Sequence, residues 1–262
     1  METYYTAVLY ILTALIGLCV GSFLNVVIYR VPEGMSVVSP PSHCPKCGYQ
    51  LKPYDNVPVI SYILLGGKCR KCREPISPRY MIVELANAAL WILSLVLFGE
   101  RSLLYAFLAA AALSTAICIF FIDLEHMLIF DRFQIIFAVL GVAASFFDPF
   151  EGPLDHLIGA VAAGGLFLLI ALVGSKVTGM DVLGGGDIKL VACIGLFLGW
   201  RRVLIAVIAA SLVASIVLLA VRKKNGDDKG TEYPFGPFLT AGFALALFLG
   251  ETIISAYLAL YL

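Results

Sequence analysis

Long apolar runs alternate with short polar segments along the whole chain. About 20 helical residues span the hydrocarbon core of a bilayer, so the pattern predicts eight transmembrane helices. The fourth run carries two charged residues, Asp131 and Arg132, and the sixth run is short. No run shows the strand-like alternation of a membrane β-barrel. The predicted fold is an all-α polytopic membrane protein. The predicted spans are 6–28, 80–98, 103–122, 128–147, 157–175, 188–200, 203–221 and 236–261.

Composition agrees with this fold class. The chain is 61% hydrophobic and 14% charged, whereas soluble domains are about half apolar and about a quarter charged. The formal net charge is zero, which by itself argues nothing about nucleic acid or acidic partners; no nucleic-acid partner is expected. The first run lacks a basic n-region and exceeds a signal h-region in length, which predicts a retained membrane helix.

The positions of lysine and arginine predict the orientation. With the N-terminus outside, all basic residues fall in cytoplasmic segments except Arg101, Arg201 and Arg202. Basic residues gather in cytoplasmic loops of membrane proteins. We therefore expect a multi-pass membrane protein with its N-terminus outside and the loop 31–79 in the cytoplasm. The predicted divisions are a first helix at 1–30, a cytoplasmic loop at 31–79 and a membrane core at 80–262.

The predicted loop 31–79 contains two CxxC pairs, Cys44–Cys47 and Cys69–Cys72, separated by residues 48–68. Four cysteines at this spacing are typical of a structural zinc site, here resembling a zinc ribbon. The alternative is a disulfide or redox role, but the cytoplasm is reducing. A closed four-thiolate site leaves no position for catalysis, so its expected task is to fold the loop. His43 adjoins the first pair and is not needed as a ligand.

Two acids are predicted at the same membrane face. Asp123 ends the third run, and Asp187 begins the sixth within Gly184-Gly185-Gly186-Asp187-Ile188-Lys189. An ionisable side chain beside the hydrocarbon layer suggests a site, although a single Asp can simply cap a helix. Two carboxylates at one depth can share a proton and hold a water molecule, as in aspartic proteases.

Two other classes of function compete with a protease. The acids can form the ion path of a proton- or cation-coupled transporter, but they lie at an interface and the chain has no evident inverted repeat. The chain can also be a zinc-ribbon membrane scaffold without chemistry. Glu84, near the start of the second run, is expected either to pair with Arg79 or to face a polar cavity.

The sequence resembles the bacterial type IV prepilin peptidase family, membrane aspartic proteases of pilus and type II secretion systems. The similarity extends over nearly the whole chain. It departs from the family pattern at Phe130 and Met81, where prolines are usual. Four blocks carry it: Gly21–Pro32; the CxxC pairs with 56–62 between them and Arg79 to Glu84 after them; Asp123 to Asp131; and Gly184–Lys189.

The resemblance implies that Asp123 and Asp187 are catalytic, with Gly184, Gly186, Lys189 and Glu84 in support. It implies removal of the basic leader of prepilins or pseudopilins at a Gly-Phe-type bond on the cytoplasmic face. Members with the zinc loop often then methylate the new N-terminus with S-adenosylmethionine, so 31–79 is a possible methyltransferase part. The sequence identifies neither the residues that bind this cofactor, nor the particular pilins, nor the oligomeric state.

The predicted helix ends also suggest how the two acids share a proton. Asp123 ends a helix, where the helix dipole disfavours negative charge, and Asp187 begins one, where the dipole favours it. On this basis Asp123 is expected to hold the proton in the resting enzyme. One acid must be ionised to activate water while the other donates to the carbonyl oxygen.

Overall fold

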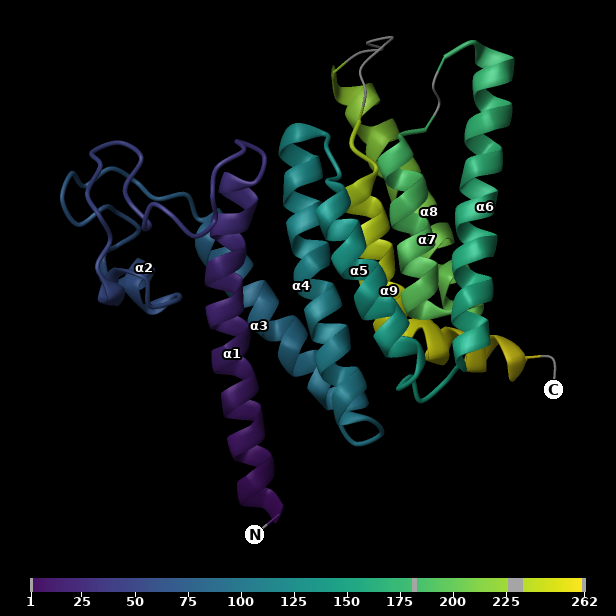
Figure 1. Ribbon diagram of the computed structural model, residues 1–262, viewed down its shortest axis with the longest axis horizontal. Helices are drawn as coiled ribbons and strands as arrows, with labels where there is room; N and C mark the ends of the chain where they lie inside the picture. Colours follow the sequence, from purple (N-terminus) through teal and green to yellow (C-terminus); the bar gives the residue numbers. More distant parts are fainter. Residues whose placement is uncertain (1, 181–182, 226–232, 261–262) are drawn as a thin grey trace. The chain divides into compact units, whose positions relative to one another are not determined.

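A computed structural model describes residues 2–180, 183–225 and 233–260 (Figure 1). This part of the chain is helical apart from turns and two isolated β-bridges. Lys229, one of the basic residues that the orientation rule assigns to the cytoplasm, lies outside the described residues. The elements are α1 (Glu2–Arg30), η1 (Pro53–Asp55), α2 (Ile60–Leu64), α3 (Arg79–Phe98), α4 (Leu103–His126), α5 (Asp131–Ser145), α6 (Pro153–Thr178), α7 (Gly185–Leu198), α8 (Trp200–Asn225) and α9 (Gly236–Leu258).

Each predicted span corresponds to a helix, but within the described ranges only six helices are long and apolar enough to cross a membrane. These are α1, α3, α4, α6, α8 and α9. The exceptions are α5, with 15 residues, and α7, with 14. Helix α5 begins only at the charged pair Asp131 and Arg132, and α7 ends before Gly199, whose φ of +79° suits glycine. Eight spans is therefore an approximate count.

The chain divides into two compact units, residues 1–118 and 119–262, with the boundary inside α4. In the first unit, α1 packs closely on α3 through two glycines. A Cβ atom at Gly17 would lie 2.8 Å from the Cα of Ala88, and one at Gly21 would lie 2.7 Å from the Cα of Glu84. Small residues let membrane helices approach in this way.

Buried polar side chains join the helices of the first unit. Asn25 Nδ2 donates to the Tyr80 carbonyl at 2.9 Å, and Asn87 Nδ2 donates to the Gly17 carbonyl at 2.7 Å. Ser114 Oγ donates to Asn87 Oδ1 at 2.7 Å and accepts the indole N–H of Trp91 at 2.9 Å. Within an apolar layer an unsatisfied amide is costly, so these bonds fix the pairing of α1, α3 and α4.

The second unit has a close-packed centre around α7. Phe137 of α5, Phe197 of α7 and Phe243 of α9 are fully buried and contact one another edge to face. A Cβ atom at Gly159 of α6 would lie 2.7 Å from the backbone of Gly195 in α7. Aromatic packing and small residues together hold the short helix α7 inside the unit.

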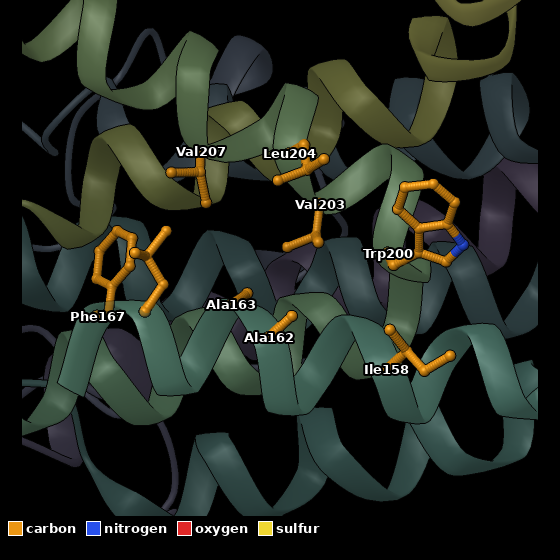
Figure 2. Close-up of a pocket in the computed structure, with 9 residues that line it drawn as sticks. Ile158, Ala162, Ala163, Phe167, Trp200, Val203, Leu204 and Val207 are labelled. Carbon is orange, nitrogen blue, oxygen red and sulfur yellow. The ribbon is translucent and has the colours of Figure 1, made fainter. Parts of the chain in front are cut away.

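Helices α6 and α8 leave an apolar pocket of about 190 Å³ between them (Figure 2). Ala162 and Ala163 of α6 face Val203 and Leu204 of α8 across it. The ring of Phe167, which also lines it, stacks on Phe235, directly before α9, with centroids 6.4 Å apart. The pocket is thus connected by packing to the start of α9.

Far along α9 from Gly236, the second unit has a charged cluster in which Asp148, Glu151, His156 and Arg202 are buried and Glu251 is partly exposed. The side chains of Asp148, His156 and Arg202 are fully buried. Asp148 Oδ2 pairs with Arg202 and lies 3.2 Å from His156 Nε2. These groups join the α5–α6 connection to α8 and α9 and lie apart from Asp123 and Asp187.

Candidate catalytic site and metal site

The four predicted zinc ligands meet in the first unit. The sulfur atoms of Cys44, Cys47, Cys69 and Cys72 all lie within 4.8 Å of one another. The Cys44–Cys72 and Cys47–Cys69 sulfur distances are 3.8 and 3.9 Å. Zn–S bonds of about 2.3 Å in a tetrahedron place sulfurs roughly 3.8 Å apart. The donor set and its spacing therefore fit a zinc ion, and all four cysteines are free of disulfides.

Both CxxC pairs have the same local backbone. The Gly48 N–H donates to the Cys44 carbonyl at 2.9 Å, and the Arg73 N–H donates to the Cys69 carbonyl at 3.0 Å. Gly48 and Arg73, each directly after a second cysteine, have φ of +67° and +61°. N–H groups of Cys72 and Lys71 lower the pKa of the Cys69 thiol to about 6, which favours the thiolate that binds metal.

Two carboxylates order the loop around the cysteines. Asp55 is buried, accepts the Arg70 guanidinium at 2.7 Å, and accepts the Lys52 N–H at 3.1 Å. Glu84 on α3 is also buried and accepts the Val59 N–H at 2.7 Å. Glu84 thus bonds to the backbone of the loop that carries the cysteines.

Asp123 lies at the C-terminal end of α4, in the second unit, and is only 4% exposed. Its Oδ2 accepts the backbone N–H of Gly236 at 2.9 Å, 113 residues along the chain. A Cβ atom at residue 236 would lie 2.6 Å from this oxygen. Only glycine therefore allows the start of α9 to approach the acid so closely.

Asp187 occupies the first turn of α7, after Gly184, which has the extended backbone of an N-cap. Its Oδ1 is buried without a hydrogen bond in the described parts of the chain. Asp187 lies outside the six candidate spans. Burial raises its pKa to about 6, and the nearby charge of Asp123 adds to the increase.

Ile129 connects the surroundings of the two acids. A Cβ atom at Gly186 would lie 3.1 Å from Ile129 Cβ, and one at Gly236 would lie 3.2 Å from Ile129 Cδ1. The residue before Asp187 and the residue bonded to Asp123 thus contact the same side chain. Both predicted catalytic acids belong to one region of the second unit.

The other predicted residues position α7. Lys189 Nζ bonds to Asp131 Oδ1 at 2.7 Å, joining the first turns of α7 and α5. Gly186, whose carbonyl accepts Gln134 Nε2 at 2.9 Å, is held against α5 as well. Phe130, which replaces the expected proline, has φ of −73° and ψ of 135°. Proline fixes φ near −65°, so Phe130 has nearly the backbone conformation that a proline would have at this position.

Sequence reasoning missed Gly236 and Gln134. Pro234-Phe235-Gly236-Pro237 at the entry to the last span was a signal for the first, because proline and glycine together mark a constrained turn. Gln134 lacks such a signal: a polar residue inside an apolar run resembles any packing residue until its partner is known. The apolar pocket of Figure 2 offers no ionisable group, so the acids and not the pocket define the candidate catalytic site.

Comparisons with known proteins point to one protein family. Residues 15–98 match the model of the Bacterial Peptidase A24 N-terminal domain, and residues 110–219 match that of the Type IV leader peptidase family. The chain is similar to the prepilin leader peptidase/N-methyltransferase of Pseudomonas aeruginosa, at 34% identity over 94% of this chain and 92% of that protein. A protein of the same name from Burkholderia pseudomallei (strain 1026b) is 36% identical over 90% of this chain and 84% of its own length. Another, from Legionella pneumophila, is 32% identical over 98% of this chain and 97% of its own length. No solved structure matches the chain.

Proposed function

Because the chain belongs to the type IV leader peptidase family, we propose that it removes the basic leader of prepilins or pseudopilins by aspartic protease chemistry. The observation that carries the proposal is that buried Asp123 on α4 and half-buried Asp187 on α7 lie close together around Ile129. Family membership favours an enzyme over the transporter and the scaffold considered from the sequence.

In this mechanism one acid is ionised and takes a proton from water, and the hydroxide forms a bond to the scissile carbonyl carbon. The other acid gives its proton to the carbonyl oxygen. The C–N bond then breaks as the first acid passes its proton to the leaving amine, and the tetrahedral intermediate returns a proton to the second acid. Water and peptide are consumed, both acids are regenerated, and no other reactant is needed.

The substrate side of the proposal rests on the membrane. A prepilin has its basic leader in the cytoplasm and its apolar helix in the bilayer, so a Gly-Phe-type bond between them lies at the inner face. The basic-residue pattern assigns that face to Asp123 and Asp187. The apolar pocket between α6 and α8, which ends at Phe167 beside Phe235, suits an apolar substrate segment.

The proposed second activity is methylation of the new N-terminal amine with S-adenosylmethionine, and the names of the relatives support it. The cysteine cluster of the first unit suits structural zinc, with four sulfurs at tetrahedral spacing. When bound, zinc supplies a rigid cross-link within 31–79 and no reacting position. Cys44, Cys47, Cys69 and Cys72 would hold it.

The deciding experiment is cleavage of a purified prepilin by Asp123→Asn and Asp187→Asn proteins in detergent. Both variants should lose cleavage by at least about a thousandfold, as expected when one member of a catalytic set is removed. Asp131→Asn is the matched control: this third acid is exposed and pairs with Lys189, so cleavage should persist. Normal cleavage by either of the first two variants would refute the aspartic mechanism.

A further inference from the structure

At the N-terminal end of α9, one backbone N–H donates a hydrogen bond to a group outside the helix. Pro237 has none, while the N–H groups of Phe238 and Leu239 both bond to the Phe235 carbonyl at 3.0 and 3.1 Å. The remaining first-turn donor, Gly236 N–H, bonds to Asp123 Oδ2 at 2.9 Å in a buried setting. The start of a 23-residue helix therefore directs its free donor at one catalytic acid.

The other acid has the opposite surroundings. Asp187 Oδ1 is buried, and no described group donates a hydrogen bond to it. The N–H of Asp187 itself turns back to the Gly184 carbonyl at 3.1 Å. Asp187 is half-buried, and a carboxyl group with one buried oxygen that accepts no hydrogen bond favours its protonated form, whereas a carboxylate that accepts an N–H bond is stabilised in its charged form.

We propose that the Gly236 N–H keeps Asp123 ionised as the base that activates water, so that Asp187 carries the proton given to the scissile carbonyl. This refines the proposed function and rests on it. It reverses the assignment predicted from the sequence, which considered only the helix that contains each acid. The structure adds a third helix, α9, whose N-terminus contacts Asp123 directly. A hydrogen bond to an ionised acceptor outweighs the more distant effect of the α4 dipole.

The other ionisable groups near Asp123 and Asp187 are exposed or half-buried and do not place the proton on Asp123. The ionic pair of Asp131 and Lys189 is exposed and joins α5 to α7. Glu125 and His126 at the end of α4, and Arg132 on α5, are exposed, and Tyr233 before α9 is half-buried. These groups lie where water screens them, whereas the Gly236 bond is buried.

The test replaces Gly236 with alanine and follows kcat/KM for prepilin cleavage against pH. The new Cβ atom would displace Asp123 Oδ2 from the N–H. The acidic limb of the profile, which reports ionisation of the base, should rise by about one pH unit, and activity on that side should fall about tenfold. Thr240→Val is the matched control, because the Thr240 hydroxyl bonds only to the carbonyls of Gly236 and Pro237. An active Gly236→Ala protein with an unmoved acidic limb would overturn the proposal.

A second measurement covers the case in which Gly236→Ala does not fold. Wild-type protein labelled with ¹³C at the aspartate carboxyl carbons is titrated, and the two resonances are assigned from their loss in Asp123→Asn and Asp187→Asn. Between the two limbs of the activity profile, Asp123 should have a carboxylate shift and Asp187 a carboxylic-acid shift. The reverse, or a proton shared equally, would overturn the assignment. If the protein cleaves no prepilin, the proposed function fails, and the titration still decides where the proton lies.

Discussion

The buried charged cluster at the end of α8 makes Asp148→Asn a strong test of what stabilises the second unit. Asp148 accepts the Arg202 guanidinium, lies 3.2 Å from His156 Nε2, and accepts the Phe150 N–H at 2.9 Å. Burial opposes its charge, but His156 and Arg202 outweigh burial and hold the pKa of Asp148 below its usual value. The substitution removes that charge and leaves Arg202 buried, with Glu251 at 3.7 Å as a remaining carboxylate.

Removing one partner of a buried ion pair costs about 3–5 kcal/mol, because the other charge stays buried. We expect a loss of this size for Asp148→Asn, measured by thermal unfolding in detergent micelles near neutral pH. For a unit of this size the midpoint should fall on the order of 10 °C. Asp123 and Asp187, the proposed catalytic acids, lie away from this cluster and should keep their geometry, so the remaining folded protein should cleave substrate at close to the normal rate.

Glu151→Gln is the matched control, in the same connection and with a carboxyl group that is only 8% exposed. Neither Glu151 oxygen has a hydrogen bond in the described residues, and burial raises the pKa of this group above its ordinary 4.5. Folding thus favours the protonated form of Glu151. The stability that this protonation contributes is complete below pH 4.5 and is lost as the pH rises through the raised pKa of the folded protein. Glutamine resembles the protonated form, so Glu151→Gln should remove this decline. Equal destabilisation by both substitutions would refute the reasoning.

Three further outcomes test other parts of the structure. Cys47→Ser should lower bound zinc, measured by metal analysis of purified protein, and expose residues 31–79 to protease. Ala162→Trp should fill the pocket between α6 and α8 and raise KM for prepilin at least several-fold with little change in kcat, because uniform binding would be lost. Lys189→Met should change the unfolding midpoint little, since its partner Asp131 is exposed and such pairs contribute about 0–1 kcal/mol.

Two of these predictions have a direct control, and the third has a result that would contradict it. Val161→Trp adds the same ring on α6 at an exposed residue that does not line the pocket, and an equal KM increase there would contradict a role for the pocket. His43→Ala should retain zinc, because His43 Nδ1 lies 3.1 Å from the Pro41 carbonyl rather than in the cysteine cluster. A large loss of stability in Lys189→Met would show that the pair with Asp131 is stronger than its exposure indicates.

Features carried by short-range patterns were predictable from the sequence. The positions of the apolar helices follow from run length, because the bilayer sets how many residues each span needs. The metal cluster follows from cysteine spacing, since one tight turn brings both sulfurs of a CxxC pair together. Asp123 and Asp187 stand out because an ionisable residue at the edge of an apolar run is costly unless it has a use.

Contacts between distant segments were decided only by the tertiary structure. No local pattern shows that Gly236 meets Asp123, that Gln134 holds Gly186, or that Glu84 binds the backbone of the zinc loop. The sequence therefore predicted which residues are candidates for chemistry, while packing decided their surroundings. A carboxyl group's protonation depends on the donors and charges within a few ångströms, and folding brings those from any part of the chain. That is why the helix containing Asp123 suggested one protonation state and the helix packed against it suggests the other.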